Sequence, residues 1–185
     1  MSHDHDTRFS RNNITSYTAN TIEEFDTFLE RVTDENLLKT LNLSKLGTDL
    51  TPQHLDAASK KFKNLTELNV SGCNLYPQNE LEMTQDVSSG LTSLIRGNPG
   101  LTKLNVSYCW EIDDSLKDTL RGSNIKYLNI ESCYGIERLT ERGALRAALP
   151  TAHIIDINGL EMKGRQTSHV AQLQAGQSSQ GRGGL

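Results

Sequence analysis

The sequence has no long apolar run, and this absence excludes membrane proteins of the usual kind. No stretch approaches the ~20 apolar residues that a membrane-spanning helix needs, so no membrane association is expected. The opening segment, MSHDHDTRFSRNN, contains neither the apolar core nor the cleavage pattern of a signal peptide. We therefore expect a cytoplasmic protein, with export by a non-classical route left open.

Basic residues are also in deficit. The chain has 19 Lys and Arg against 23 Asp and Glu, which gives a net charge of −4. Binding to a nucleic-acid backbone needs clustered basic side chains, so no nucleic-acid partner is expected. The three cysteines, Cys73, Cys109 and Cys133, are odd in number and form no CxxC pair. This excludes a disulfide scaffold and suits a reducing compartment.

Catalytic motifs are missing as well. The chain contains no glycine-rich phosphate loop, no GxSxG and no HExxH. His54, His153 and His169 stand far apart, with no ligand spacing between them. We expect no enzyme activity, no metal site, no cofactor and no small-molecule substrate.

What the sequence does contain is an internal repeat. Four segments superimpose without gaps: LLKTLNLSKL from Leu37, LTELNVSGCNL from Leu65, LTKLNVSYCWEI from Leu101 and IKYLNIESCYGI from Ile125. A weaker fifth copy, AHIIDINGL from Ala152, is predicted with Ile155, Ile157 and Leu160 in phase and Asp156 at the Asn position. The starts fall at 38, 65, 101, 125 and 152, mostly within the ~20–29 residue period of leucine-rich repeats. The second copy carries surplus residues between Tyr76 and Gly90.

Each copy predicts one strand and one helix. The pattern LxxLxL places alternate leucines on one face of a strand, and stacked copies bury those faces in a shared parallel sheet. The residue at the ninth position turns the chain inward, and it is Cys in three copies. Helical spacing follows, for example from Thr51 and Pro52 to Phe62. The expected fold is α/β, a short leucine-rich-repeat solenoid of about five strand–helix units with the parallel sheet on its concave face.

Segment boundaries follow from the same pattern. Residues 1–20 and 163–185 are polar with few apolar anchors and are expected to be disordered. Residues 21–36 predict an amphipathic helix that caps the first repeat, with Thr21 and Glu24 as a capping box. A partner-binding role for this helix stays as the alternative. The repeat domain spans 37–162.

The segments LTKLNVSYCWEIDDSLKDTL and IKYLNIESCYGI resemble the cysteine-containing leucine-rich repeat, LxxLxLxxCxxIxDxxLxxL. That repeat is familiar from F-box proteins that select ubiquitylation substrates and from bacterial host-directed effectors. The resemblance covers roughly Leu37 to Leu160, although the first and fifth copies lack the Cys. It implies a recognition solenoid, but the segment before Leu37 is too short for an F-box beside its capping helix, so attachment to a ligase complex does not carry over.

The strand residues between the inward leucines should line the open face of the sheet in three columns. These are Thr40, Glu67, Lys103, Tyr127 and Ile154; then Asn42, Asn69, Asn105, Asn129 and Asp156; then Ser44, Ser71, Ser107, Glu131 and Asn158. The amides suit either a structural ladder or ligand contact. Tyr108 and Tyr127 favour partner contact, whereas Trp110 and Tyr134 favour padding at the edge of the sheet.

These patterns predict a protein–protein interaction module. A protein partner should bind the concave face of the third and fourth repeats, with the candidate contact residues Lys103, Asn105, Tyr108, Tyr127, Asn129 and Glu131. The role would be that of a substrate-recognition adaptor of the ubiquitin-ligase type or of a host-directed effector. The alternative is a structural or assembly subunit of a larger complex without catalytic activity.

Overall fold

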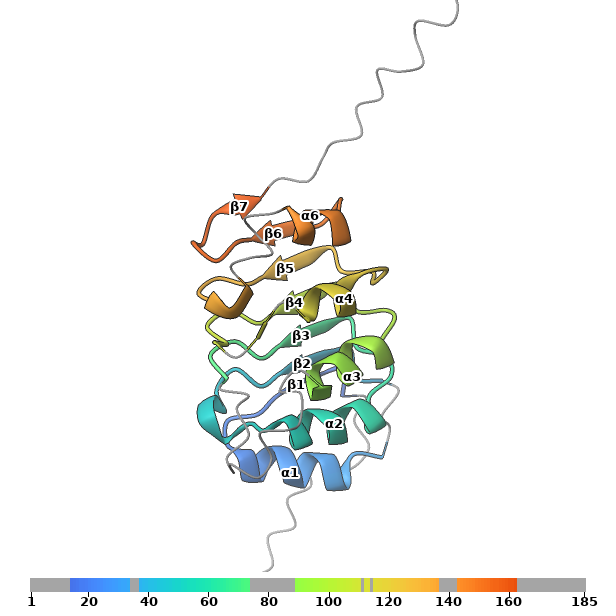
Figure 1. The fold of residues 1–185 in the computed structure, drawn as a ribbon. Helices are drawn as coiled ribbons and strands as arrows, with labels where there is room; N and C mark the ends of the chain where they lie inside the picture. Colours follow the sequence, from blue (N-terminus) through green and yellow to red (C-terminus); the bar gives the residue numbers. More distant parts are fainter. Residues whose placement is uncertain are drawn as a thin grey trace, which may run out of the picture.

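A seven-stranded sheet runs through the protein, whose computed structural model describes residues 14–33, 37–73, 89–110, 112–113, 115–136 and 143–162. The strands lie in chain order (Figure 1): β1 (Ser16–Thr18), β2 (Thr40–Asn42), β3 (Glu67–Asn69), β4 (Lys103–Asn105), β5 (Tyr127–Asn129), β6 (His153–Ile155) and β7 (Glu161–Met162). Strands β1 to β6 are parallel, and β7 returns antiparallel to β6. The predicted α/β class and parallel sheet are therefore confirmed.

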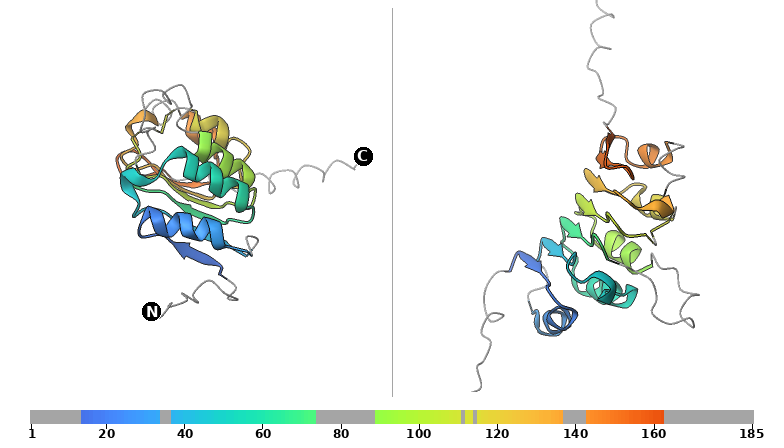
Figure 2. Two further views of the ribbon diagram at one scale, coloured as in Figure 1. Left: turned by 90° about the horizontal axis from the view of Figure 1, so that it is seen from below. Right: turned by 90° about the vertical axis from the view of Figure 1, so that its left-hand side faces the viewer.

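The helices of the described residues lie on one side of this sheet (Figure 2). They are α1 (Ile22–Arg31), α2 (Pro52–Lys61), α3 (Ser89–Gly97), α4 (Leu116–Leu120) and α6 (Ala144–Ala148), with short 3-10 helices η2 (Gly47–Asp49) and η4 (Tyr134–Ile136) after β2 and β5. Gly122, just after α4, has a φ of +77°, the left-handed conformation that often ends a helix. The opposite side of the sheet is left open by the described elements.

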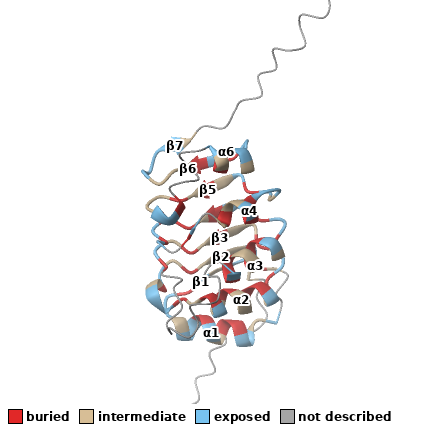
Figure 3. Ribbon diagram, viewed as in Figure 1, coloured by how far each residue is buried: buried red, intermediate tan, exposed pale blue. Residues whose placement is uncertain are grey.

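The core contains a row of matched apolar residues, one from each of strands β2 to β6. Leu41, Leu68, Leu104, Leu128 and Ile154 occupy the centre of successive strands and pair in register. All five are buried (Figure 3). The residue directly after each strand of the first four repeats is buried as well; these residues are Leu43, Val70, Val106 and Ile130. Because side chains alternate along a strand, this row faces the helices while its neighbours face the open side.

The fifth repeat differs from its prediction by one residue. Ile154 was expected on the open face, but it is fully buried and pairs with Leu128. Ile155, expected inward, pairs with Asn129 and is only partly buried. The sequence places two isoleucines side by side, so either could fill the inward position. A slip of one residue exchanges the two faces of a strand, and the contact with β5 selects Ile154.

The N-terminal boundary also needs correction. Residues 14–20 belong to the folded unit, because Ser16–Thr18 forms β1 and pairs with β2. Helix α1 then covers the end of the core, with Phe25, Phe28 and Leu29 buried. The ring of Tyr17 from β1 stacks on Phe28 at a centroid distance of 3.6 Å. Packing of the Tyr17 ring on Phe28 stabilises the short polar strand β1 in its position beside β2.

Other predictions fall outside the described residues. These are the expected disorder of residues 1–13 and 163–185 and most of the insertion between Tyr76 and Gly90. In the described part of the chain, no helix is long and apolar enough to cross a membrane.

Candidate functional site

The open face of the sheet carries two rows of side chains. The first row is Ser16, Thr40, Glu67, Lys103, Tyr127 and His153, and the second is Thr18, Asn42, Asn69, Asn105, Asn129 and Ile155. No residue in either row is fully buried. Four of the six predicted contact residues lie here, on neighbouring strands β4 and β5, where Lys103 pairs with Tyr127 and Asn105 with Asn129.

Polar partners already hold part of the first row. Lys103 Nζ lies 2.7 Å from Glu67 Oε1, and both side chains are substantially exposed. Such a surface pair adds little stability, but it neutralises the cation on this face. The ring of Tyr127 meets His153 edge to face at 5.4 Å, and His153 Nε2 lies 3.1 Å from Glu161 Oε1. The first row is therefore a set of side chains already positioned by their neighbours.

The asparagine row has a local structural role. The side-chain oxygens of Asn42, Asn69, Asn105 and Asn129 each accept the backbone N–H two residues ahead, at 2.9–3.1 Å. This bond closes the turn that ends each strand, in the manner of an Asx turn. The sequence left two roles open for these amides, a structural ladder or ligand contact. The hydrogen bonds support a structural role, but each bond lies within one repeat and none forms a ladder between repeats. The side-chain oxygens of Asn105 and Asn129 thus already accept hydrogen bonds within their own turns.

The cysteines complete the same turns from inside. All three are fully buried. Each Sγ donates to a carbonyl of the preceding repeat: Cys73 to Leu43 at 3.2 Å, Cys109 to Val70 at 3.1 Å and Cys133 to Val106 at 2.9 Å. Burial raises the pKa of the Cys73 thiol to about 11. The predicted inward placement is confirmed, and a neutral buried thiol is a poor nucleophile.

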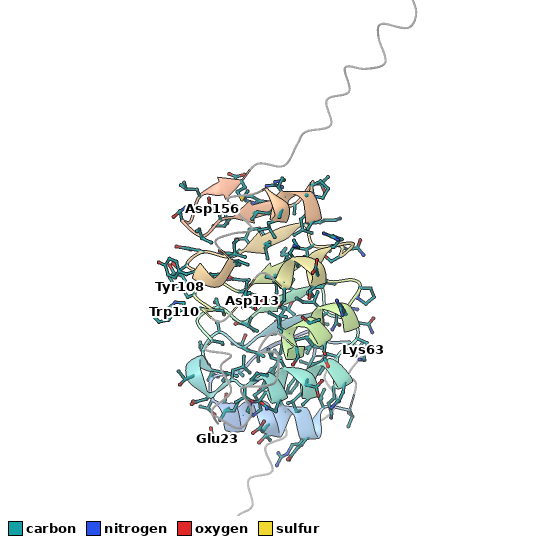
Figure 4. The ribbon with its side chains drawn as sticks, viewed as in Figure 1. Glu23, Lys63, Tyr108, Trp110, Asp113 and Asp156 are labelled. Carbon is teal, nitrogen blue, oxygen red and sulfur yellow. The ribbon has the colours of Figure 1, made fainter. Side chains whose placement is uncertain are left out.

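Large aromatic side chains gather at the edge of the sheet where β4 and β5 end. Tyr108, Trp110 and Tyr134 are 51%, 68% and 62% exposed. We call these three residues the aromatic edge; Figure 4 shows Tyr108 and Trp110 next to each other on that side of the molecule. The expectation that Trp110 and Tyr134 pad the sheet is wrong, because each residue is more than half exposed to solvent.

Tyr108 adopts a backbone conformation that its side chain disfavours. Its φ is +61°, in the left-handed region, which costs an L-residue ~1–2 kcal/mol. The equivalent positions of the second and fourth repeats are Gly72 and Ser132, with φ of +71° and +57°. In each of the three repeats the N–H of this residue donates to the next repeat: Gly72 to Ser107 O, Tyr108 to Glu131 O and Ser132 to Ile157 O. Glycine adopts this conformation freely. The third repeat thus carries an exposed tyrosine at a position where glycine would adopt the left-handed conformation without this steric cost.

Glu131 fixes the Tyr108 ring. The Tyr108 hydroxyl donates to Glu131 Oε1 at 2.8 Å. This hydrogen bond, together with the negative charge of the carboxylate, raises the pKa of the Tyr108 hydroxyl. The two remaining predicted contact residues therefore meet each other at the aromatic edge, beside the open face that holds the other four.

A pocket lies at the opposite ends of the strands, between the C-termini of α3 and α4. It has a volume of about 340 Å³ and is lined in part by Arg96, Asn98, Arg121 and Ser123. Asn98 is buried and satisfied, because it binds Leu65 N, Phe62 O and Leu94 O. The buried Ser123 Oγ has no protein partner among the described groups. The repeat pattern did not indicate this pocket, whose lining comes from the ends of two helices and the loops that follow them.

Comparison of the chain with protein-family models and with curated proteins finds no match. The described residues also contain no group of three or more His, Cys, Asp or Glu side chains that could hold a metal ion. The candidate site is accordingly defined by geometry alone, as the open face over β4 and β5 together with the aromatic edge.

Proposed function

We propose that this chain is a leucine-rich-repeat solenoid of the cysteine-containing type that acts as a protein–protein interaction module. The in-register row of leucines supports the solenoid, since each strand–helix unit packs on its neighbours. The cysteine turns support the subtype, because each thiol binds the preceding repeat in the same way. No catalytic activity is proposed.

The observation that carries the binding role is Tyr108. An exposed tyrosine in a left-handed conformation is disfavoured by its backbone, yet its exposed ring gains little from packing in the isolated chain. Residues held in costly conformations cluster at functional sites. Tyrosine and tryptophan also dominate the energetics of protein interfaces. A partner that covers Tyr108 and Trp110 would supply the burial that the isolated chain lacks.

The partner is proposed to lie on the open face of the third and fourth repeats and to reach the aromatic edge. Lys103, Asn105, Tyr127 and Asn129 would contact it on the sheet, and Tyr108 and Glu131 at the edge. Neighbouring strands are only ~4.8 Å apart, so these side chains form one continuous surface. Substrate adaptors and host-directed effectors, to which the repeat is similar, are the roles that such a surface would serve.

Affinity capture from a cell extract, followed by mass spectrometry, would identify the partner. The double variant Tyr108→Ala with Tyr127→Ala should then bind it at least about thirtyfold more weakly, because truncation of a hot spot costs ~2 kcal/mol or more. Circular dichroism would first confirm that the variant folds.

The matched control is Thr40→Ala with Ser44→Ala, on the first repeat of the same face, which should leave affinity nearly unchanged. Equal affinity of the Tyr double variant and the parent chain would refute the proposed surface. Constant stoichiometric co-purification that withstands high salt would instead indicate an assembly subunit.

A further inference from the structure

We propose that the aromatic edge binds a protein segment through arginine or lysine side chains of that segment. This rests on the proposed function and adds the chemistry of the partner. Cations would lie against the exposed rings and pair with carboxylates of the turns that follow β4, β5 and β6.

The charged side chains of the described turns beside the aromatic edge are all negative. The turns that follow β4, β5 and β6 contribute Asp113, Glu131 and Asp156, and neither Lys nor Arg occurs in residues 106–110, 112–113, 130–136 and 156–160. On the adjoining open face, Lys103 is already neutralised by Glu67 at 2.7 Å. A surface of this kind attracts cations and repels phosphate groups, which argues against a nucleic acid as the partner.

The carboxylates are held in place before any partner arrives. Glu131 accepts the Tyr108 hydroxyl, Asp113 accepts Ser115 N at 2.8 Å, and Asp156 accepts the N–H groups of Asn158 and Leu160 at 2.9 and 2.8 Å. Each carboxylate keeps further acceptor positions, since an ionised carboxylate offers about four lone-pair sites. Fixed acceptors lower the entropy lost on binding.

The rings complete the recognition of a cation. Tryptophan gives the strongest cation–π interaction among the aromatic residues, and Trp110 is the most exposed of the three. Tyr108 presents its ring in an orientation fixed by the backbone and by Glu131. A guanidinium group can stack on such a ring and bond a neighbouring carboxylate at the same time, which favours arginine over lysine.

The same edge has different chemistry in the first two repeats. The described residues of the equivalent turns, 43–50 and 70–73, contain no aromatic residue; they include Ser44, Lys45, Asp49 and Gly72. Lys45 is itself a cation and donates to Asn20 Oδ1 at 2.8 Å. Among the described residues of this edge, the exposed aromatic side chains thus lie in the third and fourth repeats, where the proposed partner surface lies.

The test uses the fluorescence of Trp110, which is the only tryptophan in the chain and therefore reports on this edge alone. The full chain would be titrated with blocked peptides (Gly-Arg)3, (Gly-Lys)3, (Gly-Glu)3, (Gly-Ser)3 and (Gly-Leu)3. A saturable change in emission is expected with (Gly-Arg)3 and, more weakly, with (Gly-Lys)3, and both should weaken as salt is raised. No saturable change is expected with the other three.

Variants separate a site from general attraction to an acidic protein. Asp113→Asn with Glu131→Gln should weaken (Gly-Arg)3 about fivefold, as expected for the loss of two partly exposed ion pairs. The charge-matched control Glu23→Gln with Glu30→Gln, on the exposed surface of α1, should change binding less than twofold. Equal losses in both variants would overturn the proposal.

Two other outcomes would also overturn it. One is saturable binding of (Gly-Leu)3 or (Gly-Ser)3 that is as tight as that of (Gly-Arg)3. The other is no response of Trp110 to any cationic peptide. If the captured partner still depended on Tyr108 and Tyr127 in that case, the proposed function would stand and only the cationic chemistry of its partner would be wrong.

Discussion

The register of β6, the strand of the fifth repeat, allows a sharp test, because two adjacent residues of the same type face opposite sides. Ile154 is fully buried and pairs with Leu128, whereas Ile155 lies on the open face and is only partly buried. Replacing each isoleucine by alanine in turn removes the same atoms from both positions. Any difference in stability then reports the environment of each side chain and not its chemistry.

The magnitudes differ enough to be measured. Truncation of Ile154 removes three buried carbon atoms at ~0.8 kcal/mol each, and the cavity left behind brings the expected loss to ~2–5 kcal/mol. Truncation of Ile155 should cost less than ~1 kcal/mol, because solvent already reaches that side chain. Strand β7 covers the edge of β6, so the fifth repeat is held from both sides.

Urea unfolding followed by circular dichroism at 25 °C would measure both variants. With a slope of ~2 kcal/mol per molar urea, a loss of ~3 kcal/mol moves the midpoint by ~1.5 M for Ile154→Ala, against a shift below ~0.5 M for Ile155→Ala. Equal shifts, or a larger shift for Ile155→Ala, would refute the observed register and restore the one expected from the repeat pattern.

Further predictions concern the core, the cysteines and the helix ends. Leu104→Asp would bury a charge between Leu68 and Leu128 and should cost several kcal/mol; an unchanged melting temperature would contradict the strand. Thiol reagents should label the three native cysteines slowly and the unfolded chain quickly, and rapid native labelling of all three would contradict their burial. Burial raises the pKa of Cys73 from its ordinary 9.0 to about 11, so the unfolded chain loses this proton first. The contribution to stability is complete below pH ~9 and is lost as pH rises through about 11, a fall of about 2–3 kcal/mol that Cys73→Ala should abolish in urea titrations at successive pH values. Asn98→Ala would leave Leu65 N without its side-chain acceptor and should cost ~2–4 kcal/mol in the same assay; a loss below ~1 kcal/mol would mean that water replaces the amide.

The sequence by itself determined the repeated part of the fold. Alternation along a strand is a local property, so LxxLxL was enough to place Leu104 and Leu128 inward. The recurrence of Cys at one position likewise predicted three buried thiols. Repetition strengthened each of these inferences, because an independent copy of the pattern supported it.

Other features were decided only by tertiary contacts. Two adjacent isoleucines gave no local preference, so the register of β6 depended on its pairing with β5. Strand β1 is polar and short, and its position depends on its pairing with β2 and on the packing of Tyr17 against Phe28. No spacing in the sequence indicates that Asn98 satisfies three backbone groups: Leu65 N–H before β3, Phe62 O at the end of α2 and Leu94 O in α3.

The candidate site shows the same division. The sequence placed Lys103, Asn105, Tyr127 and Asn129 on one face, because period and register fix which side a residue faces. It did not reveal that Tyr108 is held in a left-handed conformation, nor that Trp110 and Tyr134 protrude. Exposure depends on what the neighbouring repeats place opposite a side chain, and that is a property of the assembled stack and not of any one segment.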